Sequence, residues 1–149
     1  MSSKISTVKK ALIVSTVFAM ICLNGFTQKI KEADVPSAVK ASFAITYPGI
    51  NAKWEKEKEN FEAGFKKDGI SMSALFLPGG TLLESEMTIK QSELPSTVLS
   101  YVKANYKDKK IRESAKITRP DGPVTYEAEV EGKDLIFDSN GKFLKEVKD

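Results

Sequence analysis

Apolar residues recur every four positions in two short segments of the chain. The two sets are Val35, Val39, Phe43 and Leu94, Val98, Val102. This spacing places the three side chains of each set on one face of a helix. Pro36 and Pro95 follow the first residue of each set, and proline fits the first helical turn because its missing N–H has no partner there. The sequence therefore predicts two amphipathic helices that start at these prolines.

Between and after the helices, apolar and polar residues alternate, which is typical of half-buried strands. We predict strands near 52–58, 61–67, 70–77 and 81–89, and again near 111–119, 124–131, 134–138 and 142–148. Phe61, Ala63 and Phe65 share one face of their strand, opposite Glu62 and Lys66. Each sheet should therefore turn one face to its helix and the other to water. The predicted fold class is α+β, with each helix on its own four-stranded antiparallel sheet.

The two segments match each other along most of their length. Val35-Pro36-Ser37-Ala38-Val39 corresponds to Leu94-Pro95-Ser96-Thr97-Val98, and Phe61-Glu62-Ala63 corresponds to Tyr126-Glu127-Ala128. Phe76-Leu77-Pro78-Gly79-Gly80 corresponds in turn to Phe137-Asp138-Ser139-Asn140-Gly141. Three matched blocks in the same order indicate a tandem repeat. We predict repeats at 28–91 and 92–149.

The N-terminal segment has the pattern of an export signal. Lys4, Lys9 and Lys10 precede an apolar run over 11–23, which is shorter than the roughly 20 residues that a membrane-spanning helix needs. We predict a signal peptide over 1–27, cleaved between Thr27 and Gln28, and no stable membrane span afterwards. The expected location is the periplasm, with the cell surface or the exterior as alternatives.

Removal of the signal changes the charge of the chain. The protein has 23 Lys and Arg against 20 Asp and Glu, and the signal carries three of the basic residues and no acid. The mature chain is therefore neutral, which gives no general attraction to nucleic acid. Its only cysteine, Cys22, leaves with the signal, so the mature protein folds without a disulfide.

Little in the sequence points to catalysis. The chain contains no histidine, which excludes Ser-His-Asp and Cys-His nucleophiles and histidine-ligated zinc. Ser37 to Lys40 and Ser100 to Lys103 have Ser-x-x-Lys spacing, but the companion motifs of that enzyme class do not occur. Asp138 opens a segment similar to part of a calcium loop; a hairpin turn accounts for the same residues, and calcium binding there is left open. We predict no enzymatic activity and no cofactor.

Candidate binding residues lie on the predicted strands. Trp54 stands in a run of charged residues, where it is either an exposed anchor for a partner or a cover for the sheet or for the seam between the repeats. Glu62, Glu127 and Glu129 should point away from the helices. These four residues form the predicted partner-binding set.

In their tandem order, the Leu/Val-Pro-Ser helix start, the Phe/Tyr-Glu-Ala strand and the Phe-x-x-x-Gly hairpin resemble the PepSY-like, β-lactamase-inhibitor-like proteins exported by Bacteroidetes-type bacteria. The resemblance spans about residues 33–148. It implies a compact periplasmic protein of two α+β repeats, with an outer sheet face open to a partner and no established enzymatic activity.

The sequence therefore predicts an exported, non-enzymatic module that binds an unknown periplasmic or surface protein, in an inhibitor-like or modulator-like manner, through an outer sheet face. The alternative is a module that binds a small ligand or a metal ion at a site between the repeats.

Overall fold

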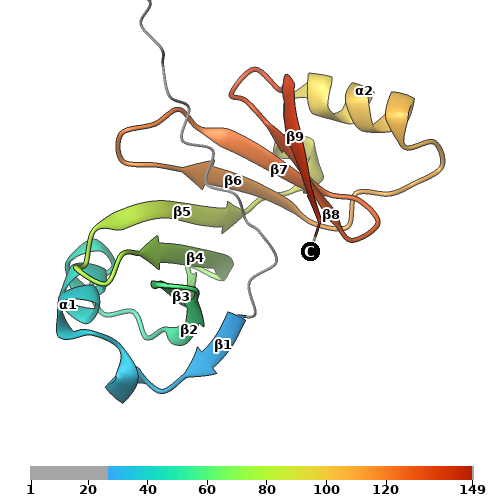
Figure 1. Ribbon diagram of the computed structural model, residues 1–149. Coiled ribbons are helices and arrows are strands. Elements are labelled where there is room, and N and C mark those ends of the chain that lie inside the picture. The colour runs from blue at the N-terminus through green and yellow to red at the C-terminus, as the bar shows by residue number, and fades with distance from the viewer. Residues whose placement is uncertain (1–26, 149) are drawn as a thin grey trace, which may run out of the picture.

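The computed structural model describes residues 27–148, which fold into an α+β structure with two α-helices and one antiparallel sheet (Figure 1). The predicted signal peptide, up to residue 26, lies outside the described residues. The first half contains β1 (Thr27–Ile30), α1 (Ser37–Thr46), β2 (Lys53–Glu57), β3 (Asn60–Lys67), β4 (Ile70–Phe76) and β5 (Leu82–Thr88). The second half contains α2 (Ser96–Asn105), β6 (Ser114–Thr118), β7 (Thr125–Glu129), β8 (Lys133–Phe137) and β9 (Phe143–Lys148).

The strands form a single nine-stranded sheet in sequence order, from β1 to β9. The prediction of two separate four-stranded sheets is therefore wrong. The two halves join because β5 pairs with β4 along one edge and with β6 along the other. Glu86 of β5 lies opposite Ser73 of β4 on one side and Ile117 of β6 on the other. The sequence pattern identifies strands, but it does not show which edges pair.

Both helices pack on the same face of this sheet, which we call the helix face. Val39 and Phe43 of α1 are buried against Trp54, Ala63 and the other members of the first core. Val98 and Val102 of α2 are buried in a second core with the strands of the second half. The cross-strand register carries this face from Ala63 through Ala74 and Ser85 to Thr118 without a break. The opposite surface, which neither helix covers, is called the open face.

Several positions correspond between the two halves. Each helix follows a proline directly and ends at a tyrosine, Tyr47 or Tyr106, whose N–H donates to the helix. A register shift interrupts the β4–β5 pair after Leu75 and the β8–β9 pair after Ile136. Such bulges bend a strand locally, so both hairpins change direction at the corresponding point.

The predicted helices and eight predicted strands all exist, within three residues of the predicted ends. Strand β1 was not predicted. It is only four residues long, pairs with β2 along one edge, and packs only Ile30 against the first core. So short a segment carries too few alternating positions to be recognised.

Candidate functional site

The open face carries most of the carboxylates of the sheet. In the first half, Glu62 of β3 lies opposite Leu75 of β4, which lies opposite Glu84 of β5. In the second half, Glu127 lies opposite Ile136, and Glu129 lies opposite Asp134. By strand alternation, the acidic residues of this face are Glu55, Glu57, Glu62, Glu84, Glu86, Glu127, Glu129 and Asp134. Apolar Ile117, Ile136 and Val147 lie among them near the junction of the two halves.

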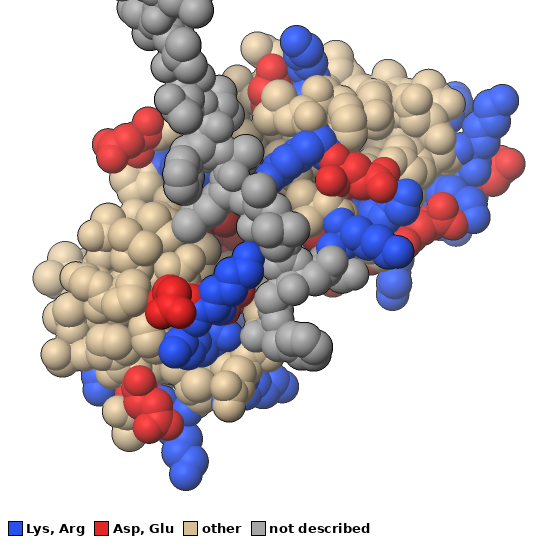
Figure 2. Space-filling model, viewed as in Figure 1, with Lys and Arg blue, Asp and Glu red and all other residues tan. Residues whose placement is uncertain are grey.

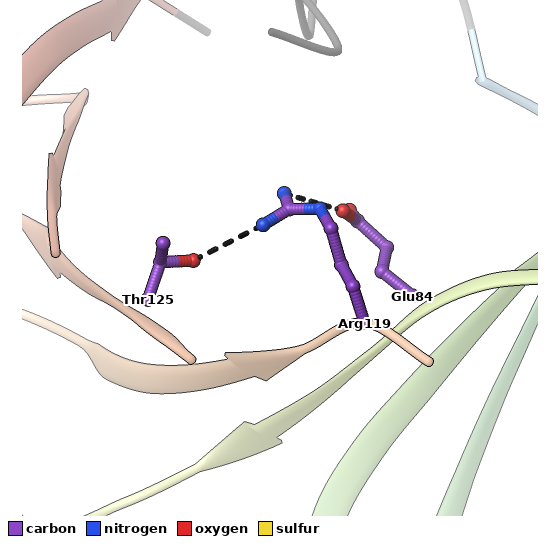
Figure 3. A network of polar contacts seen from close by, with 3 residues as sticks. All are labelled: Glu84, Arg119 and Thr125. Carbon is purple, nitrogen blue, oxygen red and sulfur yellow. Dashed lines mark hydrogen bonds and ion pairs between the residues drawn. The ribbon is translucent and has the colours of Figure 1, made fainter. Parts of the chain in front are cut away.

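Glu84 and Arg119 connect the two halves across this face (Figure 3). The Arg119 guanidinium forms an ion pair with the Glu84 carboxylate, with 2.7 Å between Nη2 and Oε2, and the Glu84 side chain is only 16% exposed. Arg119 also donates from Nη1 to the hydroxyl of Thr125 at the start of β7, over 3.4 Å. Arg119 directly follows β6, in the longer β6–β7 connection. The β6–β7 connection thus places the positive charge of Arg119 beside a carboxylate of the first half.

Glu86 is the carboxylate most strongly affected by its surroundings. Burial raises its pKa to about 7, and the nearby carboxylates of Glu62, Glu84, Asp134 and Glu113 add to the increase. Burial also raises the pKa of Glu62, although a hydrogen bond from Ser73 opposes that change. The two glutamates line a shallow hollow of about 250 Å³ together with Ser71, Ser73 and neighbouring side chains.

Glu86 also borders a second, smaller hollow at the junction of the halves. This hollow has a volume of about 50 Å³ and is lined by charged and apolar side chains of the open face. The charged ones are Glu84, Glu86, Arg119, Glu127, Asp134 and Lys145. The junction of the two halves is therefore filled almost completely by side chains.

The predicted binding residues lie in different places. Trp54 is 6% exposed and belongs to the first core, where its ring meets Phe43 edge-on at 5.4 Å between ring centroids. Glu62, Glu127 and Glu129 lie on the open face, all partly buried. The Glu129 carboxylate pairs with Arg112 at 3.6 Å between Oε1 and Nη1. Thr27 and Gln28, at the predicted cleavage point, lie in β1.

Three further residues of this face were not in the predicted set: Glu84, Glu86 and Arg119. The sequence places Glu84 and Glu86 on one strand face, so their shared orientation is visible there. Their burial depends on β6 and β8, which approach only in the tertiary structure. Arg119 gives no sequence signal, because it lies in a turn between Thr118 and Pro120.

The other candidate chemistry has a structural explanation. Asp138 Oδ1 accepts hydrogen bonds from the backbone N–H groups of Asn140 and Lys142, each over 2.9 Å, which is the arrangement of an Asx-type turn. Ser37 and Ser100 are exposed on the outer sides of their helices.

Within residues 27–148, no group of three acidic or thiol side chains is arranged to hold a metal ion. Neither helix in this range has the length and apolar character to cross a membrane.

Comparison with known proteins supports the fold. The chain is similar to a BLIP-like protein of Bacteroides fragilis NCTC 9343, with 26% identity and a TM-score of 0.61 over 74% of this chain and 84% of that one. It also resembles a DUF2874 family protein of Bacteroides uniformis ATCC 8492, with 17% identity and a TM-score of 0.67 over 74% and 87% of the two chains.

A third similar structure, from Bacteroides eggerthii DSM 20697, is described as "putative periplasmic"; it shows 17% identity and a TM-score of 0.68 over 75% of this chain and 87% of that one. No curated protein matches the chain. The family model "Putative beta-lactamase-inhibitor-like, PepSY-like" matches residues 68–145, from the β3–β4 turn to β9. The chain therefore belongs to the PepSY-like, beta-lactamase-inhibitor-like family.

Proposed function

We propose that this protein is an exported, non-enzymatic binding module that recognises a protein partner through the open face of its sheet. One observation carries the proposal: both helices cover the same face, so the opposite face of a nine-stranded sheet remains uncovered across both halves. This uncovered surface carries charged side chains and the partly exposed apolar residues Leu75 and Val147, a mixture found in protein-binding surfaces.

The charge of this face specifies the partner further. At the junction, the carboxylates of Glu84, Glu86, Glu127 and Asp134 outnumber the cations Arg119 and Lys145. Burial raises the pKa of Glu62 and Glu86, and neighbouring carboxylates add to the increase. A cationic segment of a partner would relieve this crowding. We therefore propose a partner that presents lysine or arginine to the open face.

The proposed location follows from two observations. A basic start followed by a short apolar run is typical of a secretory signal. A structural neighbour from Bacteroides eggerthii is described as "putative periplasmic". We propose that the chain is exported to the periplasm after cleavage between Thr27 and Gln28.

We also propose that the two halves are copies of one unit. Their helices, terminal tyrosines and bulges occupy corresponding positions. The second half of β5 corresponds to β1, since Ile89 and Ile30 both pack at the start of their half against its core. On this view β5 ends the first unit and begins the second, and β1 is the first strand of the first unit.

The alternative of a small-ligand or metal site between the halves has less support. The junction hollow measures about 50 Å³, whereas small-molecule sites are usually about 300–1,000 Å³.

Photo-crosslinking in cells that produce the full chain tests the protein-binding proposal. A photoreactive residue at Ser73 or Val147, both partly exposed, would report the open face, and one at Ala41 on the exposed side of α1 is the matched control. We expect one protein to be captured from both open-face positions and not from Ala41. Capture of the same protein from Ala41, or no discrete protein from either open-face position, would overturn the proposal.

A second arm tests the charge of the partner. Glu62→Gln combined with Glu86→Gln should reduce the captured protein severalfold, whereas Glu32→Gln on the helix side should not. Equal capture by all three forms would show that the carboxylates of the open face do not recognise the partner.

A further inference from the structure

A second surface, separate from the open face, lies where α2 ends and β6 begins. Its form becomes clear by comparing the two halves. Trp54 lies opposite Ala63 in the β2–β3 pair, and Ser114 lies opposite Ala128 at the corresponding place in the β6–β7 pair. Likewise Val102 of α2 occupies the helical position of Phe43 in α1.

The first half fills this region with aromatic rings, and the second half does not. Phe43 and Trp54 pack edge-to-face in the first core, with ring centroids 5.4 Å apart. Their counterparts Val102 and Ser114 are much smaller. Each of them lines a hollow of the second half.

These two hollows adjoin and share Gln91 and Ile111 in their lining. The larger has a volume of about 440 Å³ and includes Leu99, Val102 and Tyr106 from α2. The smaller has a volume of about 400 Å³. The Gln91 side chain donates from Nε2 to the carbonyl oxygen of Ile111 over 3.2 Å, at the border between the two. We call this combined depression the α2 hollow; its size is that of a small-molecule site.

The rim of the α2 hollow is basic. Lys103, Lys109 and Lys110 line the larger part, and Figure 2 shows several Lys and Arg side chains, with Asp and Glu among them, at this end of the molecule. Lys109 forms an ion pair with Glu131. Among residues 27–148, Lys103 and Lys110 have no ion-pair partner. Two unpaired ammonium groups therefore stand beside an apolar floor.

From this arrangement we infer that the α2 hollow binds a small amphiphilic carboxylate, with its apolar part against Leu99, Val102 and Ile111 and its carboxylate between Lys103 and Lys110. Burial of the apolar part supplies the main driving force, and charge-assisted hydrogen bonds to the lysines orient the ligand. Asp108 lines the same hollow, and its negative charge repels an anion. Both lysines are therefore required to offset this repulsion.

This inference does not depend on the proposed protein-binding function, because it concerns other residues on another part of the molecule. The ligand is a free single-chain molecule rather than a lipid in a bilayer, since the hollow offers only a few apolar side chains, Leu99, Val102 and Ile111, which suit one chain. An acidic protein segment is the competing occupant, and the experiment separates the two.

Decanoate below its micellar concentration is the probe, with methyl NMR of the purified protein as the readout. We expect saturable shifts at Leu99, Val102 and Ile111, and none at Val39 of the first half. Decanol should bind about tenfold more weakly, because it lacks the charge that the lysines recognise. Lys103→Gln combined with Lys110→Gln should weaken decanoate binding about tenfold, and Lys66→Gln combined with Lys67→Gln is the control of equal charge change.

Two further variants test the roles of the apolar floor and of Asp108. Val102→Phe, which installs the residue of the first half, should reduce decanoate binding by filling the floor. Asp108→Asn should tighten it about twofold to fivefold by removing a repulsive charge. Equal binding of decanol, unchanged binding by the double lysine variant, or the absence of saturable shifts would overturn the inference. Binding of an acidic peptide without binding of decanoate would also overturn it.

Discussion

Tyr106 at the end of α2 donates a hydrogen bond from its Oη to Oε2 of Glu146 in β9, over 2.5 Å. The corresponding tyrosine of the first half, Tyr47, shares a 2.7 Å hydrogen bond between its Oη and the hydroxyl of Ser85 in β5. Both tyrosines therefore tie the end of a helix to the last strand of its half. In the second half the acceptor is charged and also pairs with Lys133 at 2.8 Å.

Replacement of Tyr106 by Phe should destabilise the protein modestly. The variant loses one solvent-exposed hydrogen bond to the Glu146 carboxylate, so we expect a small decrease in the free energy of unfolding. Urea denaturation measures this change. Tyr47→Phe is the matched control in the first half. An unchanged stability of Tyr106→Phe would contradict the contribution assigned to this hydrogen bond.

The phenol of Tyr106 should titrate abnormally. The hydrogen bond to Glu146 raises the pKa of Tyr106 to about 12, chiefly because the carboxylate favours the protonated phenol. Glu146→Gln should bring this pKa back toward 10, the ordinary value. NMR titration of the tyrosine ring carbons measures it for each tyrosine separately. An unchanged Tyr106 pKa in Glu146→Gln would exclude this cause.

The stability of the protein should fall as the pH rises through neutrality. The pKa of Glu86 is about 7 in the folded protein, above the ordinary 4.5. The folded state therefore holds its proton more tightly than the unfolded state. The resulting stabilisation is complete below pH 4.5 and is lost as the pH rises to about 7.

Glu86→Gln should remove most of this pH dependence and stabilise the protein by about 1–3 kcal/mol at pH 8. Denaturation at several pH values between 4 and 8 provides the measurement. Glu93→Gln, at an exposed carboxylate, is the control and should leave the profile unchanged. If wild type were more stable at pH 8 than at pH 5, the crowding assigned to Glu86 would be refuted.

The ion pair between Glu84 and Arg119 should contribute more to stability than the exposed ion pairs. Arg119→Met leaves the poorly exposed Glu84 carboxylate without its partner, so we expect a loss of about 1–3 kcal/mol. Lys109→Met removes an ion pair whose side chains are both 48% exposed, and should cost less than about 1 kcal/mol. In a protein that already carries Glu84→Gln, Arg119→Met should decrease the free energy of unfolding by clearly less than it does in the wild type. Additive effects of the two changes would show that the residues act independently.

Gly80 should tolerate alanine less well than Gly69. Both have positive φ, +88° and +81°, so alanine strains the backbone at either place. A Cβ at Gly80 would lie 2.6 Å from the carbonyl oxygen of Ala38 in α1, whereas one at Gly69 would meet nothing within 4 Å. Gly80→Ala should therefore cost about 1–3 kcal/mol more than Gly69→Ala, as measured by urea denaturation. Equal costs would mean that α1 moves aside freely.

Local structure was predictable from the sequence because it depends on neighbouring residues. The four-residue spacing of Val35, Val39 and Phe43 produces the buried face of α1. The alternation around Phe61 and Ala63 produces β3, with every second side chain buried. The turn chemistry around Asp68 and Gly69, both at positive φ, ends one strand and begins the next.

The family was also accessible from the sequence. The tandem order of the proline-led helix starts, the aromatic-Glu-Ala strands and the glycine-closed hairpins sufficed for the resemblance, and the family model bears it out. The open-face carboxylates Glu62, Glu127 and Glu129 were identified by strand alternation alone, since successive side chains must point to opposite faces.

What the sequence could not determine is how distant segments meet. Whether β5 and β6 pair, and so join two sheets into one, depends on edges that local alternation leaves equivalent. Trp54 was ambiguous because its charged neighbours suit either an exposed ring or a buried one; the packing of Phe43 over it decided for burial. The burial of Glu86 and the ion pair between Arg119 and Glu84 bring together residues of different strands that are distant in the chain. Such contacts exist only once the chain has folded, which is why tertiary structure alone revealed them.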